Sequence, residues 1–375
     1  MQGAILHLCA LYSLMPMSNV YPPLKYMREG VVLPDSQKAL LLDIDGTLSA
    51  TKPNVVVSKR NIAAMREAID AGKRVCLATG RIPGPWTDDV RKSLGGAPYT
   101  LAGGVYSNGG LVLAADGSVV AISSLPLETV RAVVETTRGG VCPAGGGRIA
   151  VLATVHNATD GSISYIELSP DGGAPSTWCT EMITLAGEPI RTVEAFEEVL
   201  APLLTPEGPQ QQQQQPPPIL SVLKFVIFTA SMATAMYDCA PSESEAARWA
   251  PTVTPTREAL EGSGVGVLDC GSAQCEVLPA GVHKGDGAEK LISHLGVAPE
   301  TVLACGDAEN DVEMLRLVGL GVAMGNAKQA AVEACDVQLS SSNAEDGVAE
   351  AIERFALGRG SARLNGGDRA VFRVQ

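Results

Sequence analysis

The chain has 375 residues, of which 46% are hydrophobic and 18% are charged, and its formal net charge is −13 at pH 7. Such a composition is typical of a globular protein with one large or two moderate domains. The negative charge argues against binding to nucleic acid or anionic lipid through a basic surface, because both modes depend on clustered lysine and arginine. We therefore expect neither a nucleic acid nor a membrane as a partner.

The cysteines and the first residues give an expectation for the compartment. Nine cysteines are scattered without a CxxC pair in a chain too long to be a disulfide scaffold, which indicates reduced thiols. The apolar opening AILHLCALYSLM is too short to span a bilayer and lacks the basic start of a secretory signal. We predict an intracellular protein, cytoplasmic in the first place, with a plastid as the alternative.

The segment after a loosely attached N-terminal extension, residues 1–36, alternates between strand and helix patterns. ALLLD is a short apolar run, residues 58–73 have helical spacing with Ser58 as N-cap and Gly72 at the end, and RVCLATG is a second apolar run. Strand, helix and strand in this order predict a βαβ unit in a parallel sheet. A helix near Trp86 to Leu94 and a third strand in TLAGGVYSNGG follow.

The same alternation resumes near the end of the chain, so we expect residues 37–111 and 279–357 to form one α/β core. Residues 112–278 are predicted to form an inserted α+β cap. Its expected elements are a hairpin turning at Asp116 and Gly117, strands in SISYIELSPDG and LKFVIFTA, and helices near 126–137 and 192–200. The glutamine and proline tract at 205–218 should be an exposed flexible loop, and residues 358–375 a disordered tail.

Two carboxylates follow the first apolar run directly, in Asp43-Ile44-Asp45-Gly46-Thr47. Alternation along an extended strand end would place Asp43 and Asp45 on one side, so that both can face one ligand. Carboxylates this close repel each other, and a hard divalent cation such as Mg²⁺ would relieve the repulsion. A turn with a helix-capping aspartate is the competing interpretation of this motif by itself.

Three further motifs follow predicted strands or open predicted helices, at the sheet edge where ligands of parallel sheets bind. Thr79 and Gly80 could hold phosphate oxygens, although a threonine and a glycine often simply close a strand. Lys284 opens a helix, where a cation suggests an anion in front of it, although such lysines are usually only solvated. GDAENDVEML offers more acidic groups than one helix cap needs, which again indicates a metal.

In this order the four motifs resemble those of the haloacid dehalogenase superfamily, and LATGR, SNGG and HKGDGAEKL resemble its Cof-like branch. The resemblance implies a Rossmann-like core, a parallel sheet with helices on both faces, that carries an inserted cap. It also implies a Mg²⁺-dependent phosphatase that hydrolyses a small soluble phosphomonoester, such as a sugar phosphate, FMN or pyridoxal phosphate.

Carried onto matching positions, the resemblance makes Asp43 the nucleophile that forms an aspartyl-phosphate and Asp45 the general acid and base. The catalytic group is Asp43, Asp45, Thr79 and Lys284. The phosphate-binding group is Gly46, Thr79, Gly80, Lys284 and Asn108. The metal group is Asp43, Asp45 through its backbone carbonyl, Asp307, and Asn310 and Asp311, the last two orienting the ligands or reaching the metal through water.

Two alternatives remain open. A phosphomannomutase-like phosphotransferase would use the same aspartates and would be favoured by an arginine cluster in the cap, where the sequence has only widely spread arginines. A catalytically silent protein that binds phosphate and metal is disfavoured, because every catalytic position is filled. The oligomeric state is not predicted.

Overall fold

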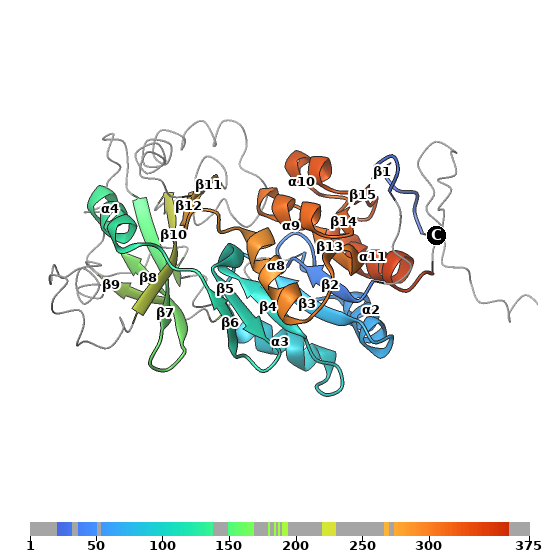
Figure 1. Ribbon diagram of the computed structural model, residues 1–375, viewed down its shortest axis with the longest axis horizontal. Coiled ribbons are helices and arrows are strands. Elements are labelled where there is room, and N and C mark those ends of the chain that lie inside the picture. The colour runs from blue at the N-terminus through green and yellow to red at the C-terminus, as the bar shows by residue number, and fades with distance from the viewer. Residues whose placement is uncertain are drawn as a thin grey trace, which may run out of the picture.

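The computed structural model shows two β-sheets joined by two chain crossings (Figure 1). The structure describes residues 21–31, 37–50, 54–137, 149–168, 179–180, 184, 187, 190–193, 220–229, 266–269 and 274–359. The larger sheet carries the motifs found in the sequence. The smaller sheet is built from the middle of the chain.

The larger sheet has nine strands in the order β1-β15-β14-β13-β2-β3-β4-β5-β6. The strands from β15 to β4 are parallel, whereas β1, β5 and β6 pair antiparallel to their neighbours. Their bounds are β1 Tyr26–Met27, β2 Ala39–Leu42, β3 Arg74–Ala78, β4 Gly103–Tyr106, β5 Leu111–Ala114, β6 Val119–Ile122, β13 Val302–Gly306, β14 Leu320–Ala323 and β15 Val337–Gln338.

The central strand β2 shows why this sheet needs apolar runs. All four of its residues are buried, and alternation sends Leu40 and Leu42 into one core cluster and Ala39 and Leu41 into another. The first cluster includes residues of helices α2 (Lys59–Asp70), α3 (Pro85–Leu94) and α11 (Gly347–Ala351). The second includes residues of α8 (Lys284–His294), α9 (Val312–Leu317) and α10 (Gln329–Ala334). Helices therefore cover both faces, which is why β2 has no polar side.

The helices of this unit have the following bounds: α2 Lys59–Asp70, α3 Pro85–Leu94, α8 Lys284–His294, α9 Val312–Leu317, α10 Gln329–Ala334 and α11 Gly347–Ala351. Short 3-10 turns are η1 Ser107–Gly109, η4 Pro299–Thr301, η5 Glu309–Asp311 and η6 Asn343–Glu345, and η7 Ile352–Ala356 is a π-helix. Ser58 caps α2 as expected, because its side chain accepts a hydrogen bond from the backbone amide of Asn61.

The hairpin that turns at Asp116 and Gly117 lies in the larger sheet, not in the inserted unit where the sequence pattern placed it. Strand β5 pairs with β4 in register from Tyr106↔Leu111 to Gly103↔Ala114, and β6 continues the sheet. The prediction began the insertion too early because a hairpin directly after a parallel strand resembles the start of an antiparallel unit. We now propose that the insertion begins near residue 124.

The smaller sheet has six strands in the order β11-β12-β10-β7-β8-β9, antiparallel except for β8 with β9. Helix α4, Leu127–Thr137, belongs to the same part of the chain and packs its valines against this sheet. The strands are β7 Ile149–Asn157, β8 Ile163–Leu168, β9 Ile190–Val193, β10 Leu220–Thr229, β11 Gly266–Asp269 and β12 Gln274–Leu278. Residues 192 and 193, expected to begin a helix, end β9 instead.

The N-terminal extension is attached to the core over residues 21–31, contrary to the expectation for residues 1–36. Leu24 is fully buried, β1 pairs with β15, and Arg28 donates to the carbonyls of Ala334 and Cys335. Two-residue strands carry almost no sequence signal, because pairing with a distant edge strand creates them.

Several predictions fall on residues outside the described ones: the extension over 1–20, the loop at 205–218, the helix over 194–200 and the tail from 360 onward. Among the described residues, no helix is long and apolar enough to cross a membrane.

Candidate active site

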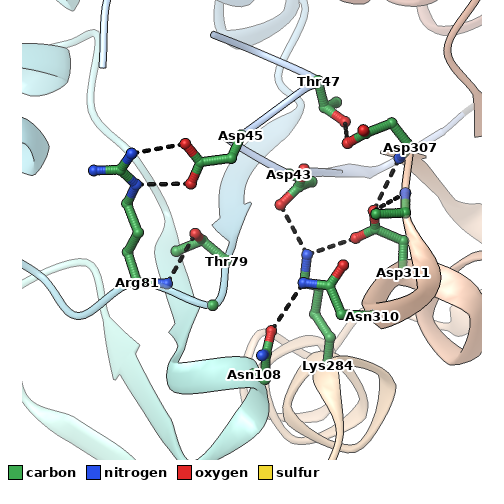
Figure 2. A network of polar contacts seen from close by, with 12 residues as sticks. Asp43, Asp45, Thr47, Thr79, Arg81, Asn108, Lys284, Asp307, Asn310 and Asp311 are labelled. Atoms are coloured by element: carbon green, nitrogen blue, oxygen red, sulfur yellow. Dashed lines mark hydrogen bonds and ion pairs between the residues drawn. The ribbon is translucent and has the colours of Figure 1, made fainter. Parts of the chain in front are cut away.

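The predicted motifs meet at the carboxyl edge of the larger sheet, where β2, β3 and β13 end (Figure 2). Asp43 follows β2, Thr79 follows β3 and Asp307 follows β13. Lys284 reaches the same place from the first position of α8, whose N-cap is His283. Parallel strands bring their carboxyl ends to one edge, so residues more than 260 positions apart in the sequence come together.

The chain turns immediately after Asp43, and this separates the two aspartates of the first motif. Backbone amides of Thr47 and Ser49 donate to the carbonyl of Ile44, and Gly46 has a φ of 89°. A Cβ atom at Gly46 would lie 2.3 Å from Oδ2 of Asp307, so only glycine fits. The extended strand end that was expected to carry both aspartates is a turn instead, and that Asp43 and Asp45 face one ligand stays a prediction. Their carboxylates take different partners.

Three buried carboxylates form the centre of the site: Asp43, Asp307 and Asp311. Each offers an oxygen within 4.8 Å of the others. Lys284 is fully buried, and its Nζ donates to Oδ1 of Asp43 at 2.8 Å and to Oδ1 of Asp311 at 2.5 Å. Thr47 donates from Oγ1 to Oδ1 of Asp307 at 2.9 Å.

The helix start after β13 fixes the orientation of Asp311. Its Oδ2 accepts from the backbone amides of Asp307 and Ala308, at 2.9 and 3.0 Å. Asp311 therefore performs the capping that the sequence allowed for one acidic residue of this loop. Because its second oxygen bonds to Lys284, the same side chain also orients the lysine.

The electrostatics of this centre are dominated by burial and by like charges. Burial, together with the charges of Asp311 and Asp307, raises the pKa of Asp43 well above its ordinary value, although Lys284 opposes the shift. Burial lowers the pKa of Lys284, but the neighbouring charges of Asp311 and Asp43 outweigh it and the net shift is upward. Lys284 is therefore a permanent cation.

A divalent cation fits this donor set. Three ionised carboxylates and one lysine leave two uncompensated negative charges in a buried place, which is the charge that Mg²⁺ carries. The donors are hard carboxylate oxygens, as Mg²⁺ prefers. Asp43, Asp307 and Asp311 would hold the ion or its water ligands.

Binding of Mg²⁺ is expected to strengthen with rising pH. The folded pKa of Asp43 is raised, so ionising it costs stability in the metal-free protein. The stability that protonated Asp43 contributes is fully present below the unfolded pKa of about 4. It is lost as pH rises through the pKa of Asp43 in the folded protein. Mg²⁺ requires the ionised group, so its affinity should gain up to about tenfold per pH unit below the folded pKa.

Thermal shift titrations with MgCl₂ between about pH 5 and pH 8 would measure this dependence. The Asp43→Asn variant serves as the control, because it lacks the proton that the metal displaces. An affinity that is equally pH-dependent in that variant would assign the proton to another group.

Arg81 directly follows Gly80 in the second motif, LATGR, and no role was predicted for it. Its Nε and Nη2 donate to the two carboxylate oxygens of Asp45, both at 2.7 Å. Figure 2 shows Asp45 pointing toward Arg81 and Asp43 pointing toward Lys284. The arginine directly after a TG pair was the signal, but its partner is 36 positions away and only the fold brings them together.

The predicted phosphate-binding residues occupy the loops beside the acidic centre. Thr79 is buried, and its Oγ1 accepts from the backbone amide of Arg81 at 3.1 Å. Asn108 accepts from Nδ2 of Asn310 at 3.0 Å and donates to Glu276 at 2.8 Å, so both ends of its amide have protein partners. The sequence expected a substrate contact there, and the structure gives Asn108 contacts within the protein.

Two residues of the smaller sheet reach this region and received no role from the sequence. Lys224 donates from Nζ to the carbonyl of Gly80 and to Oε2 of Glu276, both at 2.9 Å. Lys224 is the one charged residue in LKFVIF, and Glu276 lies between the apolar residues Cys275 and Val277 in QCEVL. That interruption is a usable signal for a buried ion pair, but it does not tell which partner each charge meets.

Comparison with known proteins identifies relatives for most of this architecture. The family model described as haloacid dehalogenase-like hydrolase matches residues 40–141 and 253–352, slightly more than half of the chain. Among solved structures, a haloacid dehalogenase-like hydrolase from Bacteroides thetaiotaomicron is similar with a TM-score of 0.60 and 24% identity, over 85% of this chain and 99% of that one. The α/β fold predicted from the sequence is confirmed.

Curated relatives are similar over shorter segments. Endoribonuclease YBEY, chloroplastic, from Arabidopsis thaliana is 41% identical over 28% of this chain. 5-Amino-6-(5-phospho-D-ribitylamino)uracil phosphatase YcsE from Bacillus subtilis is 43% identical over 22%. Phosphoglycolate phosphatase from Methanothermobacter thermautotrophicus is 39% identical over 32%. The matches span 18%, 32% and 52% of these relatives' own lengths.

Proposed function

Because the chain belongs to the haloacid dehalogenase-like hydrolases, we propose that it is a phosphatase that hydrolyses a small soluble phosphomonoester through an aspartyl-phosphate. The observation that carries the proposal is the buried trio of Asp43, Asp307 and Asp311 with Lys284 between two of them. Phosphoryl transfer depends mostly on positioning and charge neutralisation, and this centre supplies both. Two of the similar proteins are named as phosphatases.

In the proposed reaction, a carboxylate oxygen of Asp43 attacks phosphorus while the bond from phosphorus to the ester oxygen breaks. Asp45 gives a proton to the leaving alcohol and then takes one from the water that attacks the aspartyl-phosphate, releasing inorganic phosphate and regenerating Asp43. Lys284 holds the phosphoryl oxygens and shields them from Asp43. Bound Mg²⁺ would supply neutralisation of the phosphoryl charge.

Arg81 has a place in this scheme as the residue that holds Asp45. The bidentate contact fixes the Asp45 carboxylate while it is not bound to a substrate alcohol. The contact is within the described part of the chain, and it links the first motif to the second. The substrate alcohol must therefore displace Arg81 from the Asp45 carboxylate or bind beside the Arg81–Asp45 pair.

For the substrate class, we propose sugar phosphates and phosphorylated cofactors such as FMN or pyridoxal phosphate. The name of the Bacillus subtilis relative, which contains a phosphoribityl group, supports a phosphorylated polyol chain. A screen of phosphomonoesters with Mg²⁺, read as released inorganic phosphate, tests the function. Absence of phosphate release from every ester, in protein shown to be folded, would remove the proposal.

A phosphotransferase remains the second candidate, because it would use the same two aspartates. It would convert a sugar phosphate to its isomer without net release of phosphate. The same screen therefore includes a product assay for isomerised sugar phosphates. We favour hydrolysis because the matching family is described as a hydrolase family and two of the similar proteins are named as phosphatases.

Replacing Arg81 with alanine is expected to lower kcat/KM about tenfold, because Asp45 loses the partner that limits its rotamers. The melting temperature should fall as well, because the side chains of Arg81 and Asp45 are only 11% and 22% exposed and the variant removes one partner of a largely buried pair. Steady-state kinetics and thermal melts measure both effects. Arg91→Ala on α3, which breaks an exposed pair with Asp88, is the matched control. Equal kinetics in the two variants would argue against a role for Arg81.

A further inference from the structure

A buried ion pair of the smaller sheet lies against the loops of the proposed active site. The side chains of Lys224 and Glu276 are only 3% and 9% exposed, and their charges are 2.9 Å apart. Lys224 lies on β10 and Glu276 on the neighbouring strand β12. A buried ion pair of this kind adds little stability compared with apolar residues at the same positions. Stability therefore does not explain why Lys224 and Glu276 are charged.

An irregularity in β10 aims the lysine at the larger sheet. The register between β10 and β7 shifts between Val222 and Lys224, which leaves Leu223 as an extra residue. Leu223 packs into the main core of the larger sheet, whereas Val222 and Phe225 pack into the core of the smaller one. Bulges of this type redirect side chains next to active sites.

The pair touches both loops that carry predicted phosphate-site residues. Lys224 donates to the carbonyl of Gly80, in the loop after β3, at 2.9 Å. Glu276 accepts from Nδ2 of Asn108, in the turn after β4, at 2.8 Å. Asn108 in turn accepts from Asn310, which adjoins Asp311. One chain of hydrogen bonds therefore runs from the smaller sheet to Asn310, the sequence neighbour of Asp311.

In the loop at 79–81, hydrogen bonds hold the carbonyl groups of two consecutive residues, Thr79 and Gly80. The Thr79 carbonyl accepts from the backbone amide of Asn108 at 3.1 Å, and the Gly80 carbonyl accepts from Lys224. A peptide is planar, so holding its carbonyl also sets the direction of the amide that follows. The orientation of the Arg81 amide is thus set by Lys224 of the smaller sheet, whereas that of the Gly80 amide is set within the larger unit by the backbone of Asn108.

We infer that Lys224 and Glu276 are positioning residues for phosphoryl binding: the pair holds the Gly80 carbonyl and the Asn108 amide so that the loop at 79–81 is preorganised. This inference rests on the proposed function. Neither residue touches the acidic trio in the described structure, so their effect passes through Gly80 and Asn108. It also means that the insertion supports the phosphate-binding loop in addition to any role in substrate choice.

The test compares Lys224→Met, Glu276→Gln and the double variant. Each single change leaves a buried charge with one partner fewer, so both should lower the melting temperature. The double variant removes both charges and should regain most of the wild-type melting temperature. Its kcat/KM for a generic ester such as p-nitrophenyl phosphate should nevertheless stay about 10²-fold low, because the Gly80 carbonyl is no longer held.

A second measurement does not depend on turnover. Calorimetric titration of inorganic phosphate, with Mg²⁺ present, should give an affinity at least tenfold weaker for the double variant than for the wild type. The control is Glu350→Gln, which neutralises one member of another buried pair, with Arg354, whose side chains are 1% and 2% exposed. That variant should lose stability and keep its phosphate affinity.

Recovery of both melting temperature and phosphate affinity in the double variant would overturn the inference, because the pair would then be structural only. If the wild-type protein binds phosphate but hydrolyses no ester, the proposed function is refuted. The phosphate titrations of the variants would still test the positioning role of Lys224 and Glu276. A wild type that neither binds phosphate nor hydrolyses an ester would refute both.

Discussion

Replacing Asp43 with asparagine is expected to reduce kcat by about 10⁴- to 10⁶-fold, the loss seen when a nucleophile of a covalent mechanism is removed. Asparagine keeps the size of the side chain but cannot form the aspartyl-phosphate. Asp43 is the buried carboxylate that bonds to Lys284 and adjoins Asp307 and Asp311. No other described carboxylate of the trio follows β2, so none can take over its place in the geometry.

Released phosphate, measured over hours to detect residual turnover, checks this expectation. The matched control is Asp116→Asn, the same chemical change at an exposed turn of the β5–β6 hairpin. Thermal melts should show that Asp43→Asn is folded, since the substitution relieves burial of a charge and repulsion from Asp311. Turnover within tenfold of wild type would exclude Asp43 as the nucleophile.

Replacing Lys284 with methionine is expected to destabilise the metal-free protein by about 3–5 kcal/mol, the range for removing one partner of a buried ion pair. Lys284 is fully buried and donates to both Asp43 and Asp311, so the variant leaves these carboxylates facing each other without a cation. Turnover should fall by at least about 10³-fold, because a charge at the phosphoryl group is lost as well.

Thermal melts with EDTA and with excess MgCl₂ separate these effects. Mg²⁺ should restore part of the lost stability, since it neutralises the same carboxylates, but it should not restore turnover. Lys290→Met, on the same helix α8, is the control: its pair with Asp286 is partly exposed and contributes about 0–1 kcal/mol. An unchanged melting temperature of Lys284→Met in EDTA would contradict the geometry of the centre.

Local sequence determined the elements of the core and the positions of the motifs. The four apolar residues of β2 predicted a strand buried on both faces, and Ser58 predicted the start of α2, because both signals act within a few residues. The order of the motifs along the chain was enough to name the family, which the family model then matched. Their convergence followed from a general property of parallel sheets.

Only the tertiary structure decided which charge meets which. Asp43 and Asp45 were expected on one side of an extended strand end, but the chain turns at Gly46 and the Asp45 carboxylate pairs with Arg81. The sequence placed Asn108 near the site without its partners, and it gave no role to Lys224 or Glu276, whose contacts depend on a bulge in β10 and on the packing of two sheets. The hairpin β5–β6 was assigned to the inserted unit and the strand β1 was not predicted, because edge pairing has no local sequence signature.

The physical reason for this division is range. Strand and helix patterns arise from the burial of side chains close in sequence, and motif order needs only the chain itself. Ion pairs and hydrogen bonds between distant segments act over a few ångströms, so one turn or bulge changes the partner. In this protein the sequence determined that carboxylates and a lysine gather at one sheet edge. The fold decided that Lys284 lies between Asp43 and Asp311 and that the smaller sheet holds the neighbouring loop.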